Sequence, residues 1–202
     1  LTPVPEHPMA KFSVSKDYPN ATENVTFDAS KSRDPDTDIK AWNWDFGDGK
    51  KGQGETAVHS YSQGGRYIVT LTVNDNDWDM ERSSQFTQTI DVNALPIPVI
   101  DFKPKEPKLG DFIDFDGSQS NDPDPGGIIK KYYWEFGDGE NSIRKLPSPY
   151  KYESNGSYNV SLTVEDDMGA RNTTFIRIKV NLPPSALFEY SPKRPILLQN
   201  IT

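Results

Sequence analysis

The sequence predicts an all-β chain built from two tandem immunoglobulin-like β-sandwiches of about seven strands each, followed by the start of a third repeat. Three observations lead to this prediction. Two nearly identical hexapeptides, WDFGDG at 44–49 and WEFGDG at 134–139, lie 90 positions apart. Short runs alternate apolar and polar residues, as antiparallel strands with one wet face do. The 17 prolines and 14 glycines among 202 residues separate these runs, which favours strands and turns over helices.

The self-similarity extends well beyond the hexapeptides and defines a repeat. Phe12 aligns with Phe102, and further along the chain the matching segments keep their order at offsets of 88 to 91 residues. Such a fixed period indicates two homologous domains. The matching segments are NVTFDAS (24–30) with FIDFDGS (112–118), SRDPDTD (32–38) with SNDPDPG (120–126), and GGRYIVTLTVND (64–75) with NGSYNVSLTVED (155–166).

The repeat also sets the expected domain boundaries. A third copy is indicated by PPSALFEYSP, in which Phe188 and Ile201 keep the 13-residue spacing of Phe12 and Val25. The chain is expected to be cut inside this copy, because a third WDFGDG is missing. The expected segments are a leader or linker at 1–7, the first sandwich at 8–93, a short proline-rich linker at 94–97, the second sandwich at 98–181, and a linker with the first strands of a truncated third repeat at 182–202.

The period-2 pattern identifies the faces that should form each core. Trp44 shares one face with its neighbours at 42 and 46, and Val69 shares another with residues 67, 71 and 73. A bulky tryptophan in the third strand is typical of an immunoglobulin-like sandwich. The Gly-X-Tyr motifs place Tyr67 and Tyr158 at the corner where such sandwiches carry a tyrosine.

Together, the WDFGDG pair, the DPD loop before it and the Gly-X-Tyr-X-Val-X-Leu-X-Val-X-Asp strand after it resemble the PKD (polycystic kidney disease) repeat. The resemblance covers 8–93 and 98–181. It implies a seven-stranded β-sandwich found mostly in extracellular arrays, such as archaeal surface-layer proteins, eukaryotic membrane glycoproteins, and accessory modules of secreted proteases and chitinases. Members of the family mostly space, adhere or bind weakly, and the family as such implies no catalysis.

The strand order gathers acidic residues at one end of each predicted sandwich. The DPD loop and the loop after the Tyr-X-Val-X-Leu strand both lie at this end. Carboxylates crowded in this way repel one another unless a cation lies between them, and a cluster of oxygen ligands suits Ca²⁺. The resemblance to collagenase-type PKD domains implies calcium ligands at matching positions. The alternative is that these carboxylates cap turns, since Asp-Pro-Asp is a favoured turn sequence. The candidate ligands are Asp34, Asp36 and Asp75 in the first domain, and Asp122, Asp124 and Asp166 in the second. Calcium is expected as an optional ligand, and no cofactor is required.

Charge and composition exclude several classes of partner. The formal net charge of −8 disfavours nucleic acid and anionic lipid. The longest apolar runs, such as 196–198, fall far short of the roughly 20 residues that cross a bilayer, so no direct membrane insertion is expected in this segment. The chain has no cysteine, which excludes disulfides and thiolate metal sites.

Six Asn-X-Ser/Thr sequons favour a secreted or cell-surface glycoprotein, although accidental sequons in a Thr-rich chain are the alternative. Their asparagines are Asn20, Asn24, Asn155, Asn159, Asn172 and Asn200.

Catalysis is not expected. The chain has two histidines, His7 and His59, and neither has a counterpart in the second domain. No pairing of a histidine with a nucleophile at a suitable spacing is evident. Trp78, in the acidic loop 74–81, is the one large aromatic residue outside the core pattern, and it is a candidate for stacking on a sugar or anchoring a partner. The alternative is that it covers the base of its loop.

The first functional interpretation is therefore a non-catalytic extracellular spacer or adhesion module of a large cell-surface or surface-layer glycoprotein. Its expected partners are other surface proteins or carbohydrate, together with further PKD-like repeats in the same chain. The alternative is an accessory module of a secreted hydrolase or protease that binds polysaccharide or collagen. The stiff, proline-rich linker predicts that the domains stack head to tail, with the acidic end of the second near the first.

Overall fold

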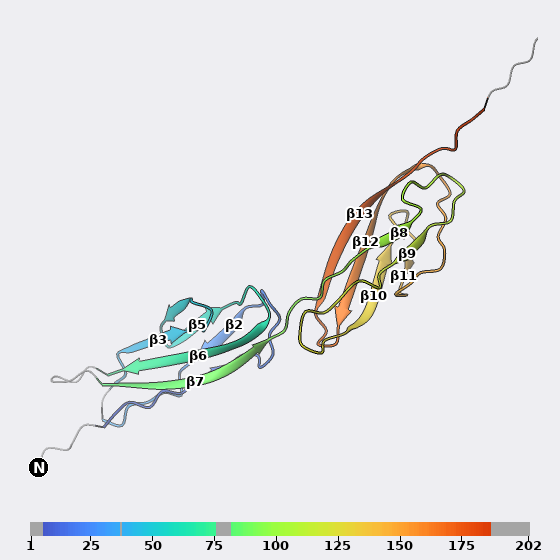
Figure 1. Cartoon of the computed structure of the whole chain (residues 1–202). Helices are drawn as coiled ribbons and strands as arrows, with labels where there is room; N and C mark the ends of the chain where they lie inside the picture. Colours follow the sequence, from blue (N-terminus) through green and yellow to red (C-terminus); the bar gives the residue numbers. More distant parts are fainter. Residues whose placement is uncertain (1–5, 37, 76–81, 187–202) are drawn as a thin grey trace, which may run out of the picture.

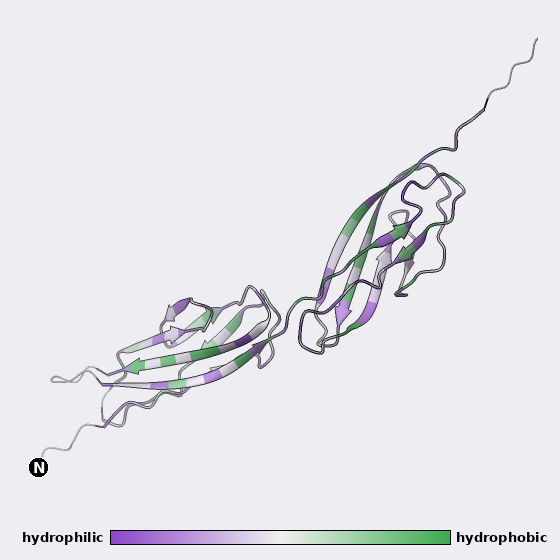
Figure 2. Ribbon diagram, in the orientation of Figure 1, coloured by the Kyte–Doolittle hydropathy of each residue, from purple (hydrophilic) through white to green (hydrophobic). Residues whose placement is uncertain are grey.

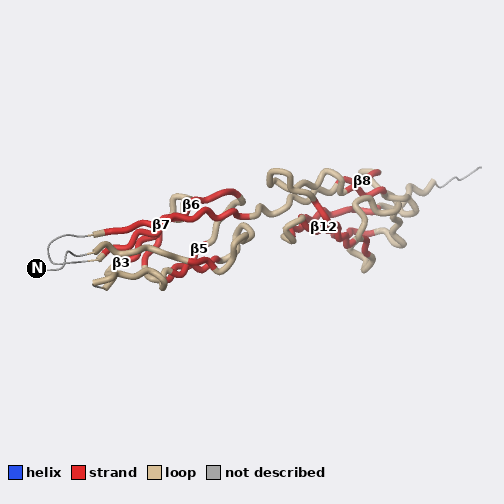
Figure 3. Tube along the Cα trace, turned by 90° about the horizontal axis from the view of Figure 1, so that it is seen from below, coloured by secondary structure: helices blue, strands red, loops and turns tan. Residues whose placement is uncertain are grey.

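The computed structural model describes residues 6–36, 38–75 and 82–186, and these residues fold into two β-sandwiches arranged end to end (Figure 1). Within this described part the secondary structure consists of strands, turns and loops, without a helix (Figure 3). The prediction of an all-β chain with two tandem immunoglobulin-like domains is confirmed. The expected third repeat falls mostly on 187–202, outside the described residues.

Domain 1 packs a sheet of three strands on a sheet of four. The order of the first is β1-β2-β5 and that of the second is β4-β3-β6-β7, all antiparallel. The strands are β1 (Ser13–Val14), β2 (Val25–Asp28), β3 (Ala41–Asp45), β4 (Lys51–Gln53), β5 (Thr56–His59), β6 (Gly65–Asn74) and β7 (Ser83–Val92).

Domain 2 repeats the four-stranded sheet, with the order β11-β10-β12-β13, and places the pair β8-β9 opposite it. Its strands are β8 (Asp101–Lys103), β9 (Asp114–Asp116), β10 (Ile129–Glu135), β11 (Asn141–Ser142), β12 (Gly156–Asp166) and β13 (Arg171–Val180). Apolar and polar residues alternate along the long strands of both domains (Figure 2), which is the pattern that predicted them.

Each core is organised around the tryptophan of the third strand. Trp44 and Trp134 are 2% and 1% exposed, and their indole N–H groups donate to the carbonyls of Gly54 and Arg144 at 2.8 and 2.9 Å. A tryptophan buries roughly 150–250 Å², which at about 25 cal/mol per Å² corresponds to an upper value of about 4–6 kcal/mol. The hydrogen bond removes the cost of burying the indole N–H.

The predicted tyrosine corners are present in both domains. Tyr67 donates its hydroxyl to the carbonyl of Gln63 at 3.0 Å, and Tyr158 donates to that of Ser154 at 2.8 Å. The same rings stack on Tyr61 and Tyr152, which lie in the core. This arrangement fixes the start of each long strand, at the end of the sandwich opposite the acidic loops.

The FGDG segments form turns. Gly47 has φ +81°, and a Cβ atom at this position would lie 2.5 Å from the carbonyl oxygen of Ile68. Only glycine combines this backbone conformation with so close an approach. Asp48 caps the turn by accepting the N–H of Lys50 at 3.1 Å.

One match in the repeat is shifted. Ser13 pairs with Asp28 in domain 1 and Asp101 pairs with Asp116 in domain 2, so the first strands correspond at an offset of 88. Phe102 therefore corresponds to Val14, and the alignment of Phe12 with Phe102 was wrong by two residues. A period-2 strand tolerates such a shift because the apolar face is preserved.

Candidate functional site

The DPD loops and the loops after β6 and β12 form one end of each domain, called here the acidic end. In both DPD loops the first carboxylate caps its own turn: Asp34 Oδ1 accepts the N–H of Asp36 at 3.1 Å, and Asp122 Oδ1 accepts the N–H of Asp124 at 3.0 Å. Turn capping, the alternative to calcium binding, therefore accounts for the Oδ1 atom of Asp34 and of Asp122.

The second aspartate of each DPD loop holds the chain that enters the domain. Asp36 Oδ2 accepts the N–H of Glu6, and Asp124 Oδ2 accepts the N–H of Ala94, both at 2.9 Å. These equivalent bonds place Glu6 and Ala94 at corresponding positions. In the sequence, Pro5 precedes Glu6 and Asn93 precedes Ala94.

Asp75, directly after β6, and Asp166, the last residue of β12, are the most deeply buried carboxylates of the acidic ends. Asp75 is 1% exposed; its Oδ1 accepts the N–H of Arg82 at 2.9 Å, and its Oδ2 has no hydrogen-bond partner. Asp166 is 2% exposed, and its Oδ1 accepts the N–H groups of Met168 and Ala170 at 2.9 and 2.8 Å. Its Oδ2 accepts a hydrogen bond from domain 1.

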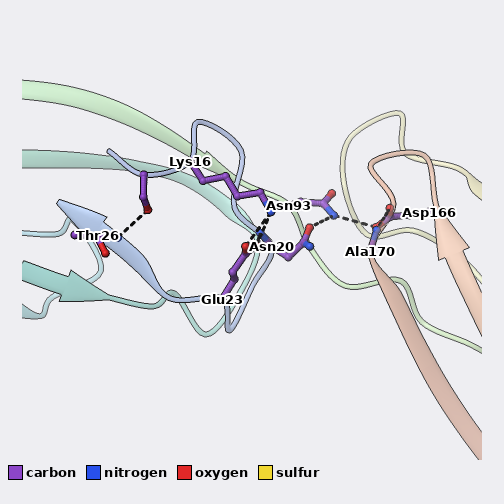
Figure 4. Close-up of polar contacts among 8 residues, drawn as sticks. Lys16, Asn20, Glu23, Thr26, Asn93, Asp166 and Ala170 are labelled. Carbon is purple, nitrogen blue, oxygen red and sulfur yellow. Dashed lines mark hydrogen bonds and ion pairs between the residues drawn. The ribbon is translucent and has the colours of Figure 1, made fainter. Parts of the chain in front are cut away.

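That bond comes from Asn93, which follows β7 and lies between the two domains (Figure 4). The Asn93 side chain donates from Nδ2 to Asn20 Oδ1 and to Asp166 Oδ2, both at 3.0 Å, while its Oδ1 has no partner. The residue is 6% exposed. The acidic end of domain 2 therefore faces domain 1, as the sequence predicts. The contacts come from Asn93 of domain 1, which bonds to Asp166, and from Ala94 of the linker, which bonds to Asp124.

A cleft of about 530 Å³ lies beside this contact, with walls from both domains. Domain 1 contributes Tyr18, Arg66 and Asn93, and domain 2 contributes Asp122 and Met168, among others. Burial raises the pKa of Asp122 above its ordinary value, and the nearby carboxylates of Asp124 and Asp166 add to the effect, although the N–H of Asp124 opposes it. The residues that line this cleft include several carboxylates, and the buried atoms Asn93 Oδ1 and Asp122 Oδ2 of two lining residues have no hydrogen-bond partner.

The acidic ends of both domains contain a buried carboxylate oxygen without a hydrogen-bond partner, Asp75 Oδ2 in domain 1 and Asp122 Oδ2 in domain 2. Carboxylate and amide oxygens are the ligands that Ca²⁺ takes, and Asn93 adds an amide oxygen beside the acidic end of domain 2. In the side-chain positions of the described residues, however, no three His, Asp or Glu groups converge in a metal-binding arrangement. Calcium binding stays a prediction for all six aspartates.

The sequons differ in accessibility. Asn24, Asn155 and Asn159 are exposed, whereas Asn20 and Asn172 are partly buried. The side chain of Asn20 bonds to Asn93, and Asn172 donates from Nδ2 to the carbonyl of Pro96 at 2.9 Å. Both partly buried asparagines take part in the contact between the domains, which disfavours them as sites for a bulky glycan. Asn200 lies outside the described residues, and glycosylation stays a prediction.

Two further residues named from the sequence are Trp78 and His59. Trp78 lies outside the described residues, and Met168, at the corresponding place in domain 2, is 54% exposed. His59 is buried; its ring stacks on Phe46 with centroids 4.1 Å apart, and its Nε2 lies 2.9 Å from Asp48 Oδ2. His59 therefore serves the packing of the FGDG turn.

The fold and this joint define a tandem pair of extended, immunoglobulin-like modules. The family model of the PKD domain matches residues 5–92 and again 93–180. The chain belongs to the PKD domain family, which confirms the resemblance. Both sandwiches of the described chain are thus PKD domains. Within the described residues, no helix is long and apolar enough to cross a membrane.

The similar proteins include a collagenase and a metalloprotease of bacteria. Collagenase ColA of Clostridium perfringens is 40% identical over 78 residues, which are 39% of this chain and 7% of the relative. The pre-pro-metalloprotease PrtV of Vibrio cholerae is 32% identical over 149 residues, which are 74% of this chain and 15% of the relative. The chain thus spans 15% or less of the length of these two relatives.

Among solved structures, the PKD1 domain of Vibrio anguillarum Epp is 34% identical, with a TM-score of 0.39. The match covers 45% of this chain and 99% of that domain.

Proposed function

We propose that this pair of PKD domains is an accessory module of a secreted protease of the collagenase or metalloprotease type, and that it binds the extracellular polymer on which the enzyme acts. The observation that carries the proposal is the set of relatives that share its sequence: ColA, PrtV and the microbial collagenase of Vibrio alginolyticus, which is 38% identical over 107 residues. An extracellular location follows from the same proposal.

The interpretation as a spacer in a surface-layer glycoprotein has less support, because the relatives named above are proteases. A spacing role is nevertheless compatible with an accessory module. The end-to-end arrangement of the domains separates the segments before and after them (Figure 1).

A sedimentation assay tests the proposal. The chain is mixed with insoluble collagen, chitin or cellulose, and the fraction that sediments is measured against chain concentration. We expect saturable binding to collagen. An unrelated acidic protein of similar size and charge is the control, and sedimentation no greater than that of the control on all three polymers would refute polymer binding.

We further propose that the acidic end of domain 2 takes up Ca²⁺. Asn93 Oδ1 and Asp122 Oδ2 support this proposal, because they are hydrogen-bond acceptors without partners beside the carboxylates of Asp124 and Asp166. When bound, calcium would neutralise the repulsion among these carboxylates.

Thermal melting with calcium and with EGTA, at equal ionic strength, tests calcium binding. A native-state ligand at 100 times its Kd stabilises by about 2.7 kcal/mol, so the midpoint should rise with calcium. Asp122→Asn should reduce the rise, whereas Asp138→Asn, at the opposite end of the same domain, should not. An unchanged midpoint at millimolar calcium would contradict the proposal.

A further inference from the structure

All four linker residues are held by one domain or the other. Ala94 donates its N–H to Asp124, and Leu95 packs against the core of domain 1. Pro96 is buried and accepts a hydrogen bond from Asn172, and Ile97 pairs antiparallel with Asn121. The linker therefore has no residue that is free to act as a hinge.

Asn93 and its acceptor, Asp166, are each held in place by contacts within their own domain. The backbone of Asn93 bonds to Pro19 O at 2.9 Å and to Ala21 N at 2.8 Å, and its side chain is also held by Asn20. The carboxylate of Asp166 is oriented by the two N–H groups of its own turn. Because both partners are preorganised, their bond costs little conformational entropy.

Other contacts within domain 1 hold Asn20, the residue that accepts a hydrogen bond from Asn93. Glu23 accepts the N–H of Asn20 at 2.9 Å and forms an ion pair with Lys16 at 2.8 Å (Figure 4). These contacts belong to domain 1 alone, so they hold Asn20 and Asn93 in place independently of domain 2.

A close backbone approach accompanies the bond. A Cβ atom on Gly64 would lie 2.5 Å from the N, Cα and Cβ atoms of Ala94. Any side chain at position 64 would therefore displace the linker at its first residue. Glycine is needed here for space rather than for a special backbone angle.

The corresponding end of domain 2 provides an internal comparison. Asn181 has the same backbone bonds as Asn93: its N–H donates to Pro107 O at 2.9 Å, and its carbonyl accepts from Leu109 N at 2.7 Å. Yet Asn181 is exposed, and Asn155 stands at the position of Gly64. Asn181 thus offers a matched asparagine with the same backbone bonds, at the end of domain 2 that lies away from the joint.

We propose that the two domains form one rigid unit, locked by the bond from Asn93 to Asp166 and by the contact of Gly64 with Ala94, and that the lock closes without a bound ion. If the pair binds a polymer, as proposed above, a rigid joint would strengthen that binding. Two binding faces in a fixed relation can contact one polymer with little further loss of entropy, which raises the effective concentration of the second contact.

Residual dipolar couplings of backbone amides, measured by NMR in EGTA, test the lock. In the wild-type chain the couplings of both domains should fit a single alignment tensor of equal magnitude and orientation. Asn93→Ala and Gly64→Ala should each give two domains with different tensor magnitudes. Asn181→Ala, at the matched position, should leave the single tensor intact.

Additional measurements keep the result unambiguous. Dispersed amide spectra establish that each variant is folded. If Gly64→Ala unfolds domain 1, Asn172→Ala replaces it, because this substitution removes the hydrogen bond to Pro96 at the edge of the joint. Different tensors in the wild-type chain, or a single tensor retained in Asn93→Ala, would overturn the proposal. A single tensor that forms only after calcium is added would overturn the claim of ion independence. Polymer sedimentation is a separate readout, so its failure would leave the lock standing.

Discussion

Asp48 and His59 join the FGDG turn of domain 1 to strand β5, with 2.9 Å between Asp48 Oδ2 and His59 Nε2. In domain 2 the corresponding pair is Asp138 and Tyr150, whose hydroxyl donates to Asp138 Oδ2 at 2.5 Å. The same carboxylate thus caps its turn with one oxygen and bonds to an aromatic ring residue, the buried His59 or the partly buried Tyr150, with the other. Two different donors serve one structural role in the two domains.

Asp48→Asn should destabilise domain 1 in a pH-dependent way. Burial raises the pKa of Asp48, but hydrogen bonds from Lys50 N–H and His59 outweigh it, so the net pKa is below the ordinary value. A lowered pKa contributes stability above the unfolded value, near 4, and this contribution is lost as the pH falls through the folded value. We expect a loss of about 1–2 kcal/mol at pH 7 that shrinks between pH 5 and pH 3.

Urea denaturation of wild type and Asp48→Asn at several pH values checks this expectation. Asp17→Asn, in an exposed loop, is the control and should behave as wild type at every pH. A difference between Asp48→Asn and wild type that stays constant down to pH 3 would contradict the role of the ionised carboxylate.

Gly47→Ala should destabilise domain 1 more than Gly49→Ala. Both glycines have positive φ, +81° and +85°, so each substitution introduces strain of about 1 kcal/mol or more. At Gly47 the new Cβ also meets the backbone of Ile68 at 2.5 Å, whereas at Gly49 nothing lies within 4 Å. Thermal midpoints measure the difference, and equal losses at the two positions would show that the close approach to Ile68 is unimportant.

Tyr61→Phe and Tyr152→Phe should each cost about 1–2 kcal/mol. The hydroxyls donate to the buried carbonyls of Phe46 and Phe136 at 3.1 and 2.7 Å, and their removal leaves those carbonyls without this partner. Calorimetry of the single and double variants measures these costs. Because the residues lie in different domains, the two losses should add, and a strongly non-additive double variant would argue against independent contacts.

The core was predictable from the sequence because burial follows a regular pattern. Trp44 and Val69 lie inside, as period-2 alternation requires, and the FGDG turn follows from its glycines. Strand register was less predictable: either Val14 or Phe12 could face the core opposite β2, since a two-residue shift preserves the apolar face.

The joint could not be predicted from local chemistry. Asn93 has no charge, and its importance depends on Asp166, which is 73 residues away. A signal was nevertheless present, because the pair Val-Asn recurs at 180–181. The roles of Asn20 and Asn172 were hidden for a different reason: both stand in sequons, which favoured modification over contact between domains.

The parallel pairing at the end of each domain has a mechanical consequence. The chain enters domain 1 at its acidic end, where Met9 pairs with Arg33, and leaves at the other end, where Asn20 pairs in parallel with Asn93. Tension along the polypeptide would therefore pull the first and last segments of the domain past one another. The bonds to Pro19 and Ala21 would be sheared together instead of opening one by one. Lys108 and Asn181 form the same parallel bridge in domain 2, so both modules would bear load in the same manner.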